Sequence, residues 1–150
     1  NGIKGKINID LSNITSIGEK AFAESDLTGT IKISKNLKIT GPDAFRQSKI
    51  TAVIIEEGVT ELGYKDHISD FDRMFMDCPN LKSITLPSSL AVLRGRVFNH
   101  CPALKEVIIP EGTKINYGES WLISYVFTGC TSLPLATRAK IKATGYNGEF

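Results

Sequence analysis

The chain has 150 residues, enough for one domain, and its 41% apolar and 23% charged content is ordinary for a globular protein. A net charge of +2, with no basic cluster between aromatic residues, does not favour nucleic acid as a partner. No apolar run approaches the roughly 18–20 residues that a membrane span needs, so no transmembrane segment is expected in this chain. The chain begins with Asn1-Gly2 and carries no signal peptide, so we expect a mature form or a chain whose leader has been removed.

In chain order, the first predicted element is an incomplete strand over 6–10, in which polar and apolar residues alternate. The same alternation returns at 30–33, 52–55, 83–86 and 106–109. The three clearest copies follow an L-x-x-L-x-L pattern: Ile50/Val53/Ile55, Leu81/Ile84/Leu86 and Leu104/Val107/Ile109. A period of two predicts short strands with one buried face.

Five phenylalanines mark a repeated unit: Phe22, Phe45, Phe75, Phe98 and Phe127. Their spacings are 23, 30, 23 and 29 residues, so the basic period is 23 and two units carry insertions. A period of about 20–29 residues with this core is the signature of a leucine-rich repeat. Each unit should be a strand, a turn and a short helical turn around the phenylalanine. A unit of this size cannot bury its own apolar face, so the units are expected to stack.

Residues 97–110 repeat residues 74–87 almost letter for letter, with the motif Phe-x-x-Cys-Pro-x-Leu-Lys. On this motif the chain resembles the BspA-like leucine-rich repeat proteins over approximately 5–135. We therefore predict an α/β repeat solenoid, a right-handed superhelix with a parallel β-sheet on one side and short helices on the other. The resemblance also implies a secreted or cell-surface protein of the kind found in anaerobic bacteria, some of which are adhesins. It implies no catalytic motif and no defined ligand pocket.

The two insertions occupy 64–73 and 117–125. Ile68, Phe71 and Phe75 fall at helical spacing, so the first insertion is predicted to lengthen a convex-side helix. In the second, Ser120 is predicted to cap a helix over 121–128. Both insertions should project from the same side of the stack, two repeats apart.

The repeat pattern stops after Leu133, and 134–144 is predicted to form a helix ending at Gly145. We expect it to cover the last repeat as a cap, over approximately 134–145, that completes a single domain of residues 1–150. The residues expected to face that repeat are Leu135, Ala139 and either Ile141 or Ala143. Residues 146–150 are expected to be a tail.

Three cysteines, Cys78, Cys101 and Cys130, share one repeat position with Ser25 and Ser48, which suggests a buried ladder of small side chains. Their number and spacing favour neither a disulfide framework nor a zinc site. His100 lies beside Cys101, but adjacent residues of a helical turn point about 100° apart, which is poor geometry for a nucleophile and its base. From these residues we expect no catalytic residue, no metal and no cofactor, and hence no enzyme.

Two candidate binding surfaces remain. Outward positions of the predicted strands supply the first: Lys32, Ile54, Thr85, Ile108, Glu56 and Glu106. The insertions supply the second: Tyr64, His67, Tyr117, Trp121 and Tyr125. Exposed apolar residues in a row can mark a protein contact, whereas isolated ones such as Ile54 and Ile108, two strands apart, are also normal on a protein surface. Trp and Tyr are enriched in interface hot spots.

We therefore expect a non-enzymatic recognition or adhesion module, extracellular or at the cell surface, that binds a host or bacterial surface protein through both surfaces. One alternative is a carbohydrate-binding module that uses Trp121 and the tyrosines, since these rings stack on sugars. The other is a structural spacer without a ligand. Trp121 has a plain alternative role too, which is to pack the lengthened helix onto the core.

Overall fold

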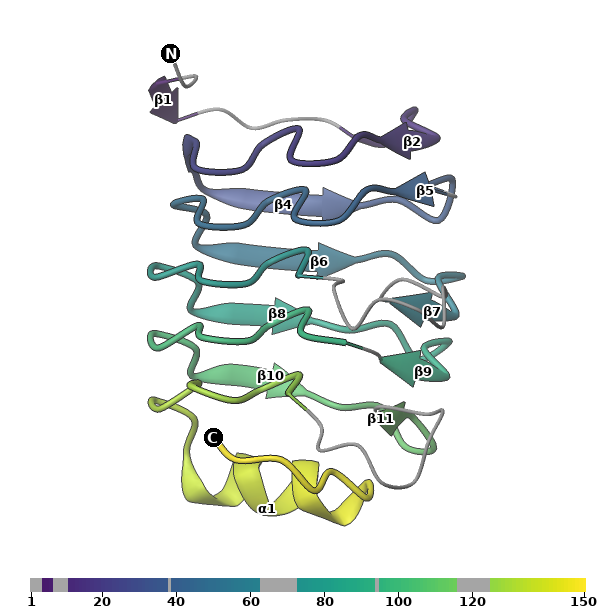
Figure 1. The fold of residues 1–150 in the computed structure, drawn as a ribbon. Helices are drawn as coiled ribbons and strands as arrows, with labels where there is room; N and C mark the ends of the chain where they lie inside the picture. Colours follow the sequence, from purple (N-terminus) through teal and green to yellow (C-terminus); the bar gives the residue numbers. More distant parts are fainter. Residues whose placement is uncertain (1–3, 7–10, 38, 63–72, 94, 116–124) are drawn as a thin grey trace.

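A computed structural model describes residues 4–6, 11–37, 39–62, 73–93, 95–115 and 125–150. The described residues form a stack of similar coils, with a helix at the C-terminal end (Figure 1). This confirms the predicted repeat architecture with parallel strands and a C-terminal helix. The right-handedness of the superhelix stays a prediction.

The main sheet, here called the long-strand sheet, has one strand from each of four successive coils. Its members are β4 (Thr30–Ile33), β6 (Ala52–Ile55), β8 (Ser83–Thr85) and β10 (Glu106–Ile108), in the order β10-β8-β6-β4. All neighbouring pairs are parallel. Each strand has an inward side chain that is buried in register with that of the next strand: Ile31, Val53, Ile84 and Val107. Ile33 of β4 and Ile55 of β6 are buried as well. The predicted period of two is therefore confirmed.

A separate pair lies nearer the N-terminus, where β1 (Lys4–Lys6) runs parallel to β3 (Asp26–Thr28). The strand predicted over 6–10 overlaps β1 only at Lys6. Its remaining residues lie outside the described part of the chain.

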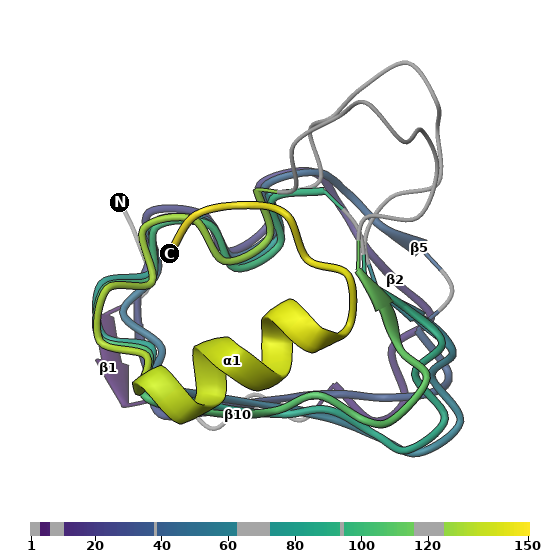
Figure 2. The same cartoon turned by 90° about the horizontal axis from the view of Figure 1, so that it is seen from below.

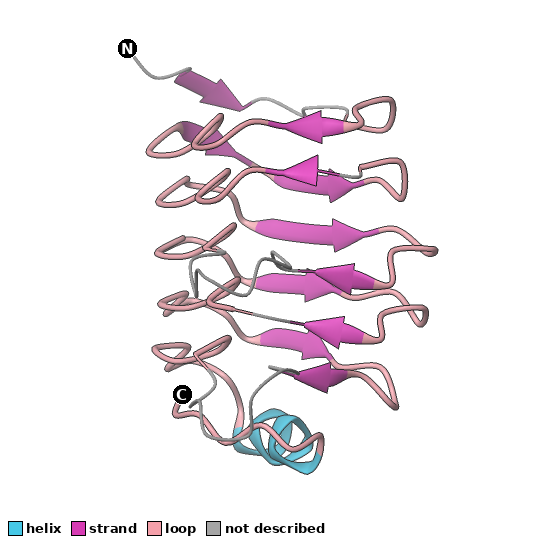
Figure 3. Ribbon diagram, turned by 45° about the vertical axis from the view of Figure 1, so that its right-hand side comes forward, coloured by secondary structure: helices cyan, strands magenta, loops and turns pink. Residues whose placement is uncertain are grey.

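A second set of strands, each of two residues, follows the first turn of each coil. Three of them, β7 (Glu61–Leu62), β9 (Val92–Leu93) and β11 (Lys114–Ile115), form one parallel sheet. Two more, β2 (Ser16–Ile17) and β5 (Ile39–Thr40), pair with each other. Figure 3 shows these short arrows on the side of the stack next to the long-strand sheet. The sequence pattern predicts only an apolar pair after a turn here and gives no indication of this second sheet.

The prediction of short helices opposite the long-strand sheet is wrong for the described residues, because the phenylalanine segments are hydrogen-bonded turns. In all five coils the residue two positions after the phenylalanine, just before the serine or cysteine, has a positive φ angle: Glu24 (54°), Gln47 (58°), Asp77 (58°), His100 (53°) and Gly129 (80°). A residue in this left-handed conformation ends a helical turn. The chain therefore turns back toward the long-strand sheet after one turn.

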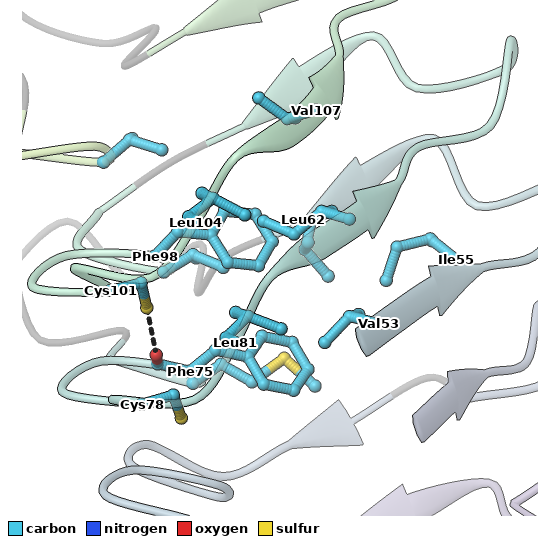
Figure 4. Close-up of a cluster of buried hydrophobic side chains, with 14 of the residues drawn as sticks. Val53, Ile55, Leu62, Phe75, Cys78, Leu81, Phe98, Cys101, Leu104 and Val107 are labelled. Atoms are coloured by element: carbon cyan, nitrogen blue, oxygen red, sulfur yellow. Dashed lines mark hydrogen bonds between the residues drawn. The ribbon is translucent and has the colours of Figure 1, made fainter. Parts of the chain in front are cut away.

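The predicted phenylalanine column is confirmed. Successive rings, from Phe22 to Phe127, stack with centroids 5.0, 5.2, 5.6 and 6.0 Å apart and planes within 15° of parallel. Phe22 is partly buried, and the other four rings are fully buried. In Figure 4 the Phe75 and Phe98 rings lie among Leu81, Leu104 and inward residues of the strands.

The predicted C-terminal helix is confirmed as α1 (Leu135–Ala143), which begins after Pro134 and is followed by Gly145 with φ 93°. It lies across the end of the stack (Figure 2). Only Ile141 of its expected inward residues is buried. Of the two alternatives Ile141 and Ala143, it is therefore Ile141 that faces the last repeat. Leu135 is 82% exposed and Ala139 is also exposed, so the prediction that these two cover the last repeat is wrong.

The expected tail, 146–150, is also wrong in part, because Tyr146 is buried. Its ring meets Phe127 edge-on, with centroids 5.9 Å apart, and Phe150 packs against Tyr146 in turn. The segment therefore closes the phenylalanine column.

Candidate functional site

The outward side chains of the long-strand sheet form two straight rows, which we call the strand face. Lys32 pairs with Ile54, Ile54 with Thr85, and Thr85 with Ile108. The second row lies two residues earlier on each strand: Thr30, Ala52, Ser83 and Glu106. Neighbouring strands lie about 4.8 Å apart, so these side chains form one continuous surface. The sheet thus brings together five of the six predicted strand residues.

The apolar members of the strand face are open to solvent. Ile108 is 82% exposed and Ile54 38% exposed. Thr85 separates them and is exposed too. The Ile108 side chain buries little apolar area in the folded chain, so this area is available for a contact with a partner.

Charge is unevenly distributed over the strand face. At the β4 end the Lys32 ammonium lies 2.7 Å from a carboxylate oxygen of Glu56, the sixth predicted residue. This hydrogen bond, together with one from the Lys35 backbone amide, lowers the pKa of the Glu56 carboxyl. At the β10 end Glu106 is exposed, beside Ile108. The face therefore has an ion pair at one end, small and apolar groups in the middle, and a carboxylate at the other end.

The second predicted surface is described only at its edge. Tyr64, His67, Tyr117 and Trp121 lie outside the described residues, as do both insertions for nearly all of their length. The described end of the helix predicted over 121–128 is a turn. Tyr125 is 38% exposed, and the Arg96 guanidinium lies 4.8 Å from the centre of its ring. This cation–π contact fixes the Tyr125 ring where the second insertion rejoins the stack.

Arg96 and Tyr125 belong to a column that sequence reasoning missed. The position two residues before each phenylalanine holds Lys20, Asp43, Arg73, Arg96 and Tyr125. The Arg73 guanidinium lies 2.7 Å from the Asp43 carboxylate, which is 3% exposed. A neighbouring bridge joins Arg46 to Asp77 at 3.1 Å. The signal was available in the repeat register, since the opposite charges of Asp43 and Arg73 at the same position of successive coils predict contact between those coils.

The three cysteines form the predicted ladder of buried, free thiols. Each thiol donates to the carbonyl of the phenylalanine in the preceding coil: Cys78 to Phe45 (3.2 Å), Cys101 to Phe75 (3.2 Å) and Cys130 to Phe98 (3.1 Å). The Cys101 bond is drawn in Figure 4. Burial raises the thiol pKa of Cys78 to about 11 and that of Cys130 to about 12, and raises that of Cys101 well above its usual value. A thiol that stays protonated at neutral pH is a poor nucleophile.

His100, next to Cys101 in the chain, is largely exposed, and its Nδ1 lies 2.5 Å from Oδ1 of Asn99. The Cys101 thiol is committed to the Phe75 carbonyl, so the two residues do not form a nucleophile and base. Within the described ranges, no group of three His, Cys, Asp or Glu residues is arranged to hold a metal ion. No helix of the described chain is long and apolar enough to cross a membrane.

These features define a leucine-rich repeat protein whose coils are joined by parallel strands and by a column of stacked aromatic rings. The model of the BspA type leucine rich repeat region matches six copies over residues 5–134. The chain therefore belongs to the BspA type leucine-rich repeat family.

Three solved structures are similar to this chain. A leucine-rich repeat protein from Bacteroides ovatus shares 26% identity with a TM-score of 0.56, over 81% of this chain and 34% of its own. The T. pallidum leucine-rich repeat protein shares 19% (TM-score 0.43; 91% of this chain, 79% of its own). A leucine rich cell surface protein from Faecalibacterium prausnitzii shares 20% (TM-score 0.37; 89% and 54%). This chain spans about a third of the B. ovatus protein, and no curated protein matches it.

Proposed function

We propose that this chain is a non-enzymatic recognition module that binds a protein partner through the strand face. The observation that carries the proposal is the straight row Lys32–Ile54–Thr85–Ile108, in which a largely exposed isoleucine ends a flat run of small, apolar and hydroxyl side chains. The contact would centre on Ile108 and Ile54, with Glu106 and the Lys32–Glu56 pair as its charged rim. This arrangement, with apolar anchors inside a polar border, is the usual anatomy of a protein interface.

Rigidity favours this face for binding. Its side chains stand on parallel strands whose inward neighbours are buried, so little backbone order has to be gained on association. Isoleucine also loses little rotamer freedom because it is branched at Cβ. The insertion residues Tyr64, His67, Tyr117, Trp121 and Tyr125 form a second proposed surface.

The family supports a cell-surface or secreted setting, and a host or bacterial surface protein as the partner. Residues 1–150 act in this proposal as one rigid unit. The buried thiols, with their raised pKa values, support a role without nucleophilic chemistry.

The test compares two double variants with matched exposure. The strand-face variant carries Ile54→Lys and Ile108→Lys, at residues that are 38% and 82% exposed. The control carries Ile14→Lys and Leu135→Lys, at residues that are also 38% and 82% exposed but lie off the strand face. Binding to immobilised host matrix proteins and to bacterial surface proteins is measured for both.

We expect the strand-face variant to lose at least about tenfold in affinity, since two apolar anchors that the partner would cover become charged, while the control binds like the parent. Equal binding by the two variants would refute the strand face as the site. A glycan array run in parallel separates the carbohydrate alternative, in which sugars bind and Trp121→Ala abolishes that binding. A spacer without a ligand predicts no binding in either assay.

A further inference from the structure

The charged groups around the strand face are paired within the chain at one end of the sheet. Around β4 and β6, the Lys32 ammonium lies 2.7 Å from the Glu56 carboxylate, and the Lys49 ammonium lies 2.6 Å from the Asp26 carboxylate. The Glu57 carboxylate accepts hydrogen bonds from two backbone amides and a hydroxyl in the turn after β8. This half of the strand face therefore has its charges matched by groups of the same chain.

Two lysines at the other end of the sheet are not matched in this way. Lys82 stands immediately before β8 and Lys105 immediately before β10, at the starts of two neighbouring strands (Figure 1). The Lys105 amide donates to the Lys82 carbonyl at 2.9 Å, so the two residues lie side by side at about the 4.8 Å spacing of neighbouring strands. Both are exposed, and neither ammonium forms an ion pair or a hydrogen bond with the described residues.

The stack does not need a lysine at this position. The coil before holds Thr51 there, and its amide donates to the Gly29 carbonyl at 2.9 Å, as the Lys82 amide donates to the Thr51 carbonyl at 2.9 Å. Backbone atoms make these bonds, whatever the side chain. Two ammonium groups in neighbouring coils repel each other, so their charges add nothing favourable to the fold. An arrangement that the fold does not use is expected where function uses it.

The two lysines border the most exposed part of the strand face. Ile108 in β10 is 82% exposed, and its neighbour Thr85 in β8 is exposed too. Glu106 is exposed on the same face, between Lys105 and Ile108 along the chain. Its carboxylate repels an acidic group placed above the middle of β10. The anionic groups of a partner are therefore favoured at the strand starts, over the lysines.

We propose that the partner of the strand face carries an acidic segment, in which two neighbouring Asp or Glu carboxylates bind Lys82 and Lys105 and an adjacent apolar residue covers Ile108. The carboxylates would lie about 5 Å apart, the spacing of the two strands. They replace the repulsion between the ammonium groups with attraction, which speeds association and fixes the register of the partner on the sheet. This inference rests on the proposed function, because it gives the chemistry of the partner at the same face.

The experiment selects ligands without a known partner. A phage-displayed library of random peptides is selected on the immobilised chain, and soluble copies of the enriched peptides are measured at low salt. The test variant is Lys82→Thr with Lys105→Thr, which places at both positions the residue that the fold already has at Thr51. One control, Lys82→Arg with Lys105→Arg, keeps the charges. The other, Lys20→Gln with Lys140→Gln, removes two exposed lysines that lie off the strand face.

We expect the enriched peptides to contain at least two Asp or Glu residues beside an aliphatic one. Their affinity should fall at least about fivefold in the threonine variant, chiefly through slower association, and stay at the parent value in both controls. High salt should reduce the difference, because exposed charges are screened. Equal affinity for the parent and the threonine variant would overturn the proposal, and so would a selection that enriches no acidic peptide.

A further variant, Ile108→Ser, separates this inference from the proposed function, since it removes the apolar group and adds no charge. Peptides that lose affinity in Ile108→Ser but not in the threonine variant would leave the strand face as the binding site and reject the acidic partner. Peptides that bind both variants like the parent would count against the strand face itself.

Discussion

The phenylalanine column and the strand face obey opposite rules. In the column, five coils carry the same aromatic ring, stacked at 5.0–6.0 Å, and the same small serine or cysteine three residues later. On the strand face, four equivalent positions carry Lys32, Ile54, Thr85 and Ile108. One surface repeats its chemistry in every coil, and the other changes it at every step.

The difference follows from what each surface touches. A coil in a stack contacts only its neighbours, so every interface makes the same demand on ring size and on the small residue beside it. The outer face of the sheet contacts solvent and is free to vary. Recognition is therefore expected where the repeat pattern is broken, and stability where it is kept.

The largest expected effect tests the column directly. Phe98→Ala should lower the free energy of unfolding by about 3–5 kcal/mol, because it removes a fully buried ring between two others. Ile108→Ala, at an 82% exposed position one coil further along, should change it by less than about 0.5 kcal/mol. Urea unfolding measures both. A loss below about 1 kcal/mol for Phe98→Ala would contradict the column as the core.

The next effect sharpens the comparison within the column. Gly129→Ala should cost about 2 kcal/mol, because φ is 80° and a Cβ would lie 2.6 Å from Cδ2 of His100. Gln47→Ala is the matched control. Gln47 already has a Cβ at the equivalent position, with φ 58°, so its replacement should cost less than about 0.5 kcal/mol. If thermal unfolding shows the same loss of stability for both variants, steric crowding between coils is not the reason for glycine at position 129.

A smaller effect tests how the column ends. Tyr146→Phe should cost about 1–2 kcal/mol, since the buried Phe127 amide loses its acceptor while the ring remains. Tyr125→Phe, on an exposed ring, should be close to neutral. Faster hydrogen exchange at the Phe127 amide in Tyr146→Phe alone would confirm the role of the hydroxyl. Unchanged exchange there would contradict it.

The smallest effect concerns the thiols. Their pKa values are raised on folding, so the unfolded chain releases protons first and stability falls as pH rises through the ordinary thiol value of 9.0. Between pH 8 and 9 each thiol should cost about 0.3 kcal/mol, or about 1 kcal/mol for the three. Below pH 8 they should have almost no effect.

The matched control replaces Cys78, Cys101 and Cys130 with serine, the residue already present at positions 25 and 48. Urea unfolding at several pH values should show a smaller decline for this variant than for the parent. Parallel declines would mean that the thiols ionise as easily in the folded protein as in the unfolded chain.

Sequence alone determined the repeat period, the phenylalanine column, the cysteine ladder, the inward residues of the long strands and the helix at 135–143. This was possible because each coil packs against a neighbour of the same kind. The same packing requirements therefore recur in the sequence with a basic period of 23 residues. The outward residues of the strand face followed from the same period of two.

Tertiary structure decided the features that depend on a particular contact. The two-residue strands are too short to show a periodic pattern in the sequence. The left-handed residues that end each helical turn include Glu24 and Gln47, and neither is a residue type that predicts a positive φ angle. Tyr146 is buried and Leu135 is exposed because of the direction in which α1 crosses the last coil. The local sequence pattern does not predict that direction. Parallel pairing likewise set Ile54, Thr85 and Ile108 side by side although 31 and 23 residues separate them in the chain, because hydrogen bonds between strands, not neighbours in sequence, determine register.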